Sequence, residues 1–197
     1  HLLRCPFDLS MDWGLAESRI GLVCGDPRPL PTDLELRLQE RQCPVVQIGF
    51  GGLGLQFDSS LLSLWPDHHF VMATPSDPTI CQQLESMDNV TLMPAGVRPL
   101  DLFPHCQRHL GKPGFSTFSE ALTHRVGLHV VERDGFAEVT PLMEGLRRHG
   151  SYRELTRDQL MTGAWQLNQS LVSPTHCSLA ADGAQKAAEI VIRIAES

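Results

Sequence analysis

Short apolar runs alternate with stretches of helical spacing along most of this sequence, beginning at Pro44. Runs of this kind, bounded by Gly, Pro or Asp, are typical of buried strands, and the intervening stretches have the periodicity of amphipathic helices. The alternation favours a parallel sheet, because each strand regains its direction through a right-handed helical crossover. We therefore predict an α/β domain whose parallel sheet has about six strands, with helices on both faces.

The boundaries of the individual elements follow from the same pattern. Strands are expected at 44–50, 68–74, 89–95, 108–113 and 127–132. Helices are expected at 57–65, 77–86, 99–106, 116–125, 137–149, 156–171 and 182–197. Asp77 is the expected N-cap of the second of these helices, and Pro78 lies in its first turn, where the missing N–H is harmless.

The first 43 residues have a different character. A Pro-rich stretch at 25–33 precedes the sequence LELRLQERQ, which favours a short helix. We expect residues 1–43 to form an N-terminal extension or a connection from another domain, followed by a domain at 44–197. The chain begins at His1 rather than Met, so we also expect the native N-terminus to lie outside it.

Composition excludes several classes of protein. The formal net charge is −7 and the basic residues do not cluster, which argues against binding to nucleic acid. No apolar run approaches the length of a membrane span. The cysteines are scattered without the spacing of a zinc site, so we expect no metal and no cofactor, and free thiols in the cytoplasm. These cysteines are Cys5, Cys24, Cys43, Cys81, Cys106 and Cys177.

A first glycine-rich turn follows the predicted strand at 44–50. The sequence IGFGGLGLQ contains Gly49, Gly51, Gly52 and Gly54. Glycines permit positive φ angles and allow a ligand to approach the backbone closely. Ligands of open α/β sheets bind beyond the carboxyl ends of the strands, where this turn falls. The motif is therefore a candidate binding turn, with a plain tight turn as the alternative.

A second turn, GKPGFSTFSEAL, begins at Gly111. Its candidate nucleotide-binding residues are Lys112, Gly114, Ser116, Thr117, Ser119 and Glu120. The free amides and the dipole of a helix start favour an anion, and a lysine nearby suits a diphosphate. The carboxylate further along the helix can accept hydrogen bonds from both hydroxyls of a ribose. The alternative is a capping box, formed by Ser116 with Ser119 or by Thr117 with Glu120.

A third polar cluster follows the predicted strand at 127–132. Arg133, Asp134 and Glu138 lie between this strand and the next helix. Their carboxylates can accept hydrogen bonds from sugar hydroxyls. The alternative is that Asp134 caps the helix and the acidic residues favour its first turn.

Together, these segments resemble the nucleotide-binding half of GT-B glycosyltransferases, of the MurG-like and UDP-glycosyltransferase type. The closest resemblance is to the glycosyltransferase-like half of plant L-arabinokinase, through GKPGFSTFSEAL, RDGFAE at 133–138 and LMTGAW at 160–165. The resemblance covers approximately residues 44–195. It implies a single Rossmann-like domain, the C-terminal half of a GT-B fold, that binds a nucleotide-sugar.

The resemblance also implies roles for individual residues. Gly51, Gly52 and Gly54 would face the phosphates or the acceptor, and the amides of Ser116 and Thr117 would hold the diphosphate. Glu120 would bind the ribose, and the backbone near Val97 and Arg98 would read the base. Asp134 and Glu138 would contact the sugar. A UDP-sugar is the expected substrate or ligand, and catalysis would require an N-terminal acceptor-binding domain. The alternatives are a non-catalytic regulatory or ligand-binding module and a domain like that of nucleotide-sugar epimerases.

Overall fold

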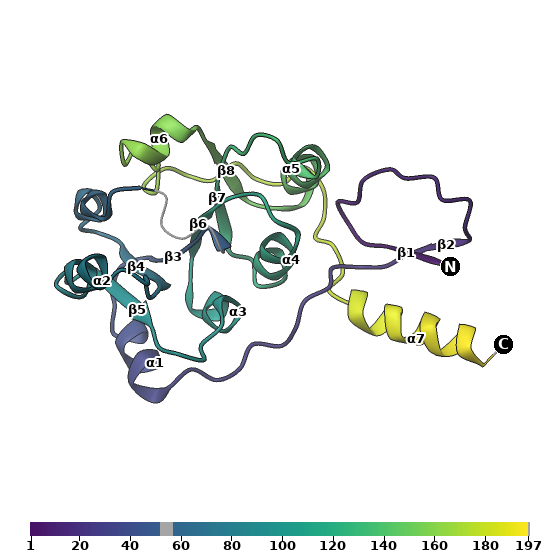
Figure 1. Cartoon of the computed structure of the whole chain (residues 1–197), viewed down its shortest axis with the longest axis horizontal. Coiled ribbons are helices and arrows are strands. Elements are labelled where there is room, and N and C mark those ends of the chain that lie inside the picture. The colour runs from purple at the N-terminus through teal and green to yellow at the C-terminus, as the bar shows by residue number, and fades with distance from the viewer. Residues whose placement is uncertain (52–56, 197) are drawn as a thin grey trace.

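The computed structural model describes residues 1–51 and 57–196 and is built around a six-stranded parallel sheet (Figure 1). The spatial order is β5-β4-β3-β6-β7-β8. This is the doubly wound order, in which the chain starts in the middle, builds one half of the sheet and then crosses to build the other. The strands are β3 (Val45–Gly49), β4 (His69–Ala73), β5 (Val90–Met93), β6 (Arg108–Gly111), β7 (Gly127–Val131) and β8 (Tyr152–Leu155). The predicted α/β class is confirmed.

Helices lie on both faces of the sheet, as predicted, and the C-terminal helix lies apart from it (Figure 1). They are α1 (Thr32–Gln39), α2 (Pro78–Glu85), α3 (Pro99–Leu102), α4 (Phe115–Thr123), α5 (Val139–His149), α6 (Arg157–Met161) and α7 (Gly183–Ala195), with 3-10 turns η2 (Ser59–Leu64) and η3 (Phe103–His105). Asp77 caps α2 as expected, because its carboxylate accepts from Thr79 N at 2.8 Å. The helix predicted at 57–65 is the 3-10 turn η2, capped by Asp58.

Alternate strand positions supply hydrophobic cores on the two faces of the sheet. Val46, Ile48 and Phe70 point to the face covered by η2, α2 and α6, where they pack around the fully buried Trp165. Val45 and Leu128 point to the opposite face, which is covered by α1, α3, α4 and α5. Burial on both faces explains why the central strands read as continuous apolar runs rather than as alternating ones.

Two predictions fail after residue 149. The edge strand β8 was not predicted, because its two central residues, Arg153 and Glu154, are polar. The helix predicted at 156–171 is wrong beyond Met161, where α6 ends. Gly163 and Gln166 take positive φ angles of 75° and 56°, which turn the chain so that Trp165 enters the core.

The first part of the N-terminal extension and α7 lie to one side of the six-stranded sheet (Figure 1). Leu2–Arg4 (β1) and Glu17–Arg19 (β2) form a separate two-stranded parallel sheet, which the sequence pattern did not predict. The short helix expected after the Pro-rich stretch is α1, which buries Leu34 and Leu38.

Candidate functional site

In the doubly wound order, the connections after the neighbouring strands β3 and β6 lead in opposite directions along the sheet. The connection after β3 leads toward β4, whereas the connection after β6 leads toward β7, on the other side. The two strands are paired in parallel, with Gly49 opposite Gly111, so both end at the same edge of the sheet. Ligands of such folds bind in the crevice at this divergence. The described start of the first glycine-rich turn and the second turn therefore lie at the same edge.

Gly51 and Lys112 are brought together across the divergence. Gly51 has a φ of 61°, a conformation that favours glycine. A Cβ atom placed on it would lie 3.7 Å from both Cε and Nζ of Lys112. Burial, and next the positive charge of Arg133, lower the pKa of Lys112. Gly52 and Gly54 lie outside the described residues.

The second turn leads into α4 without a side-chain cap. Gly114 is the N-cap, and α4 begins at Phe115, with Phe118 N donating to the Gly114 carbonyl at 3.0 Å. The alternative of a capping box is therefore wrong, because Ser116 and Thr117 already lie within the first turn. The amide groups of the first turn have no partner within the helix. They remain available to an anion at the edge of the sheet.

Ser116 and Ser119 lie on different sides of α4. Ser116 is exposed, whereas Ser119 is fully buried on the core side with Phe118. The Ser119 hydroxyl has no hydrogen-bond partner within the described part of the chain. Its side chain thus belongs to the core, although the sequence placed it with the nucleotide-binding residues.

Glu120 is a half-buried carboxylate on α4. No hydrogen bond to its side chain occurs among residues 1–51 and 57–196. Burial raises the pKa of Glu120, the charge of Arg98 opposes this increase, and the charge of Asp101 adds to it. A carboxylate that is partly removed from water and lacks a donor can gain from an incoming hydroxyl group.

Arg98 is held firmly at the start of α3. Its Nε donates to Asp101 at 3.0 Å, and its Nη2 donates to the carbonyl of Asp26 at 2.8 Å. Asp101 also accepts from the backbone N of Arg28 at 2.8 Å. The hydrogen bonds from Arg98, followed by those from Arg28, hold the pKa of Asp101 far below its usual value despite burial. This network fixes the loop of Val97 and Arg98 between β5 and α3.

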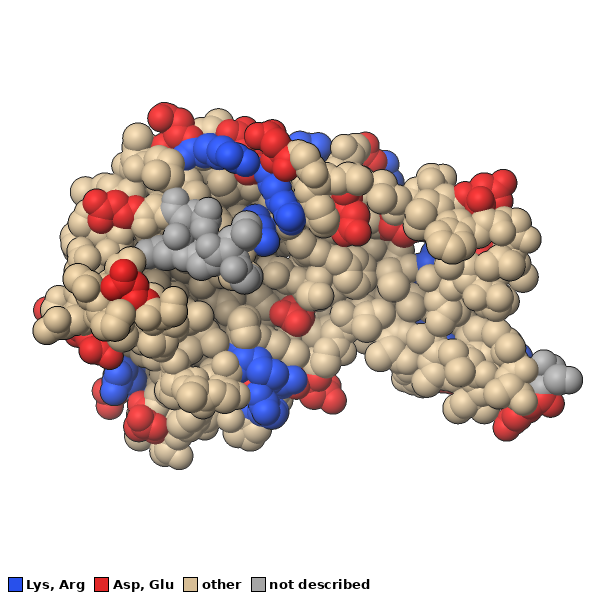
Figure 2. Space-filling model, in the orientation of Figure 1, with Lys and Arg blue, Asp and Glu red and all other residues tan. Residues whose placement is uncertain are grey.

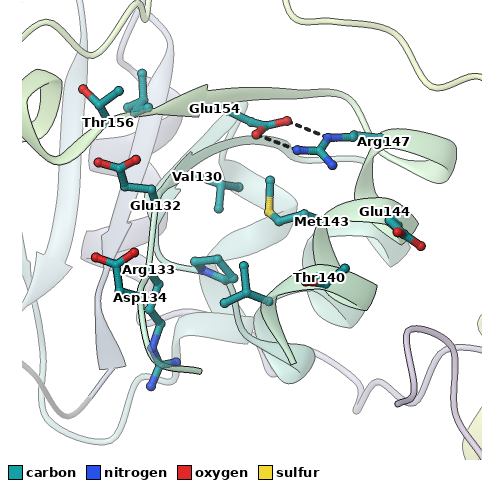
Figure 3. Close-up of a pocket in the computed structure, with 13 residues that line it drawn as sticks. Val130, Glu132, Arg133, Asp134, Thr140, Met143, Glu144, Arg147, Glu154 and Thr156 are labelled. Carbon is teal, nitrogen blue, oxygen red and sulfur yellow. Dashed lines mark hydrogen bonds and ion pairs between the residues drawn. The ribbon is translucent and has the colours of Figure 1, made fainter. Parts of the chain in front are cut away.

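Part of the third polar cluster lines a pocket of about 370 Å³ between the β7–α5 loop and β8 (Figure 3). Arg133 and Asp134 contribute to its wall, but Glu138 does not line it. Asp134 does not cap α5, since Glu138 occupies the N-cap position and its side chain makes no capping hydrogen bond. Glu154 on β8 accepts two hydrogen bonds from Arg147, at 2.8 and 2.9 Å, on the other side of the pocket.

A second pocket, of about 320 Å³, lies between the end of β3 and α6. It brings Lys112 and Arg133 together with Arg157, which the sequence analysis did not identify. Glu132 also lines it and accepts from Arg157 N at 2.8 Å. The sequence TRDQ could have indicated that Arg157 begins a helix, because Thr156 and Gln159 form the capping box at the start of α6.

Charge is unevenly distributed at this edge of the sheet. Figure 2 shows Lys and Arg side chains gathered along part of the rim of a hollow. Among the described residues, no group of three or more His, Cys, Asp or Glu side chains is placed to hold a metal ion. No helix in the same part of the chain is long and apolar enough to cross a membrane.

No protein-family model and no curated protein sequence matches the chain. Among solved structures, spinosyn forosaminyltransferase SpnP is similar over 84% of this chain and 46% of its own, with a TM-score of 0.56 and 17% identity. A UDP-glucosyltransferase from Polygonum tinctorium, in complex with 3,4-dichloroaniline, is similar over 75% of this chain and 36% of its own, with a TM-score of 0.51 and 20% identity.

These similarities establish a fold shared with one part of glycosyltransferases. The chain spans less than half the length of both proteins. The expected GT-B type of domain is confirmed at the level of the fold. The closer resemblance to MurG-like proteins and L-arabinokinase remains a prediction.

Proposed function

We propose that the chain is the nucleotide-sugar-binding domain of a GT-B-type glycosyltransferase and that its ligand is a UDP-sugar. The fold, the two turns at one edge and the free amides at the start of α4 support this function. The name of one similar structure, a UDP-glucosyltransferase, favours uridine as the base. Transfer of the sugar would require an acceptor-binding domain in addition to residues 44–197.

Each part of the ligand has a proposed partner. The diphosphate binds to the Ser116 and Thr117 amides and to Lys112, near Gly51 and Gly114. The base lies against the backbone of Val97 and Arg98, and the ribose lies against Glu120. The sugar extends toward Asp134 and Glu138. Helix amides and a lysine supply the positive potential that the diphosphate needs, so the proposal requires no metal ion.

The observation that carries the proposal is the position of Glu120. It lies on the same helix as the free amides, half-buried and without a hydrogen-bond donor among the described residues. A carboxylate left without a donor in a partly desolvated position costs stability, and a bound ribose would supply two hydroxyl donors. A purely structural role does not explain this arrangement, because no capping contact involves Glu120.

Calorimetric titration of the 197-residue chain with UDP, ADP and GDP tests the proposal. We expect weak binding with a preference for UDP, because an acceptor domain would complete the cleft in the whole protein. Addition of EDTA should not change the affinity. Equal affinity for all three nucleotides, or no binding at millimolar concentrations, would contradict it.

A further inference from the structure

We propose that the sugar of the nucleotide-sugar ligand carries a carboxylate, and that Lys112, Arg133 and Arg157 bind this group in the second pocket. The inference rests on the proposed function, and it specifies the chemical class of the donor: a nucleotide-activated uronic acid or another acidic sugar. The proposed function by itself requires no charged group on the sugar.

The three cations reach the pocket from separate elements. Lys112 follows β6, Arg133 follows β7, and Arg157 is the first residue of α6, after β8. They therefore lie side by side along the carboxyl edge of neighbouring strands. Apart from Glu132, the rest of the described lining is apolar and consists of Phe50, Val131, Leu160 and Met161. A pocket lined by cations and apolar side chains suits an anionic group attached to a sugar ring.

The positive charges are only weakly compensated within the protein. Neither Lys112 nor Arg133 forms an ion pair among the described residues. Arg157 Nη2 lies 3.6 Å from Asp134 Oδ2, and both side chains are largely exposed, so this pair contributes little. The carboxylate of Glu132 accepts a hydrogen bond from the backbone N of Arg157, and this bond directs the carboxylate toward the start of α6.

Arg133 is also held in place without neutralisation of its charge. Its guanidinium carbon lies 3.8 Å from the ring centroid of Phe136. A cation–π contact of this kind orients a guanidinium and leaves its N–H groups free to donate. A carboxylate can then receive two parallel hydrogen bonds from the fixed group, the geometry in which arginine binds carboxylates best.

The diphosphate alone does not account for three cations at these positions. It binds beside β6, at the start of α4, where Lys112 is available. Neighbouring strands are about 4.8 Å apart, so Arg133 and Arg157 follow strands that lie about 5 and 10 Å farther along the edge. These are the positions that the sugar occupies as it extends from the diphosphate toward Asp134. A neutral sugar would cover Lys112 and Arg133 and give neither an ionic partner, which is unfavourable.

Two pairs of ligands test the inference. Binding of UDP-glucuronate is compared with that of UDP-glucose, and binding of glucuronate 1-phosphate with that of glucose 1-phosphate, by calorimetry or by NMR titration. The two members of each pair differ only at C6 of the sugar, which is a carboxylate in one and a hydroxymethyl group in the other. We expect the acidic member to bind about tenfold more tightly in both pairs, the effect of one charge-assisted hydrogen bond.

The variant Arg157→Gln localises the effect. It should reduce the preference for the acidic ligands to about threefold or less, with unchanged affinity for UDP. Arg157→Lys should recover part of the preference, and Arg193→Gln on α7, with the same change of charge, should leave it intact. Thermal unfolding of each variant verifies that the fold is retained.

The outcomes separate this inference from the proposed function. Binding of UDP with equal affinity for both members of each pair overturns the inference alone. An equal loss of UDP and UDP-glucuronate affinity in Arg157→Gln also overturns it, because Arg157 would then bind the diphosphate. A preference for glucuronate 1-phosphate without any binding of UDP supports the acidic-sugar site and contradicts the assignment of uridine. Absence of binding by every ligand overturns both.

Discussion

The ammonium nitrogen of Lys112 lies against the backbone of Gly51, 3.7 Å from the position that a Cβ atom on this glycine would occupy. Gly51 follows β3 and Lys112 follows β6, so the contact joins the two glycine-rich turns where the strands diverge. The distance is an ordinary van der Waals contact, so glycine is favoured here by its positive φ of 61° and not by lack of room. An anion bound at the start of α4 would therefore meet a cation on its β3 side.

Replacement of this lysine tests the diphosphate site. Lys112→Gln should lower the affinity for UDP and for inorganic pyrophosphate by about tenfold, the effect of losing one charged hydrogen-bond donor. Calorimetry in low and in high salt should show that the variant depends less on ionic strength. The chain contains one other lysine, Lys186 on α7, and Lys186→Gln is the matched control. Equal losses in the two variants would exclude a specific role for Lys112.

Glu120→Gln tests the ribose contact separately. The substitution keeps one acceptor oxygen but removes the charge, so UDP affinity should fall by about tenfold or more, since a hydrogen bond to a charged group contributes about 1.5–3 kcal/mol. Pyrophosphate affinity should not change, because this ligand has no ribose. The melting temperature should stay constant or rise slightly, because the substitution removes a charge that burial disfavours in the folded chain.

A second carboxylate serves as the control for this variant. Glu189→Gln on α7 makes the same chemical change away from the carboxyl edge and should affect neither ligand. If Glu120→Gln binds UDP as tightly as the parent chain does, Glu120 does not contact the ribose, whatever the effect of Lys112→Gln.

The sequence predicted the central strands because both faces of the sheet are covered. Val46, Phe70 and Leu128 are fully buried, so their strands read as apolar runs. The edge strand β8 has no such signal. Its Glu154 is bonded to Arg147, and its Arg153 donates to the carbonyl of Ser170, at 2.8 and 2.9 Å respectively. Polar contacts of this kind arise from the tertiary structure and leave no periodicity in the sequence.

The candidate site was predictable to a similar extent. Turns that follow buried strands are recognisable, which is why Gly51 and Lys112 were identified. The alternative of a capping box fails because α4 begins at Phe115, which places Ser116 and Thr117 within the first turn. Ser119 lies on the core side of the helix with Phe118. Arg157 was missed because its role depends on β8, which the sequence did not reveal.

Substitution of Gly111 and of Gly114, both in the second glycine-rich turn, should change the free energy of unfolding by different amounts. A Cβ atom on Gly111 would lie 2.4 Å from the carbonyl oxygen of Gly49 and 2.5 Å from His109 Nε2. Gly111→Ala therefore forces β6 away from β3, and we expect a loss of about 2 kcal/mol or more in the free energy of unfolding. Gly114 has an extended φ of −167° and no atom within 4 Å of its Cβ position.

Gly114→Ala is consequently the control for that substitution. Alanine is a somewhat poorer N-cap than glycine, so we expect a loss of at most about 1 kcal/mol. Urea denaturation of the two variants measures both quantities. Similar losses in the two variants would show that the close approach of β3 and β6 does not limit the residue at position 111.

The buried His109 predicts a specific dependence of stability on pH. Gln47 Nε2 donates to the carbonyl of Pro99 at 3.2 Å, which turns Gln47 Oε1 toward His109 Nδ1, at 2.8 Å. Nδ1 therefore carries the proton. Nε2 is buried without a partner among the described residues. A second proton would place an uncompensated charge in the core, and burial accordingly lowers the pKa of His109 to about 4, with a smaller contribution from His129.

The sign of the effect follows from proton uptake. Between the folded pKa of about 4 and the ordinary value of 6.5, the unfolded chain binds a proton that the folded chain does not. The free energy of unfolding should thus decrease as the pH falls through this window, and His109 alone should account for about 2 kcal/mol between pH 7 and pH 5. Urea denaturation at the two pH values measures the decrease. His109→Asn retains a donor toward Gln47 but cannot titrate, so its decrease should be smaller by this amount. NMR titration provides a direct measurement on the unmodified chain: the ring of His109 should stay neutral at pH 5, and a pKa near 6.5 would contradict the prediction.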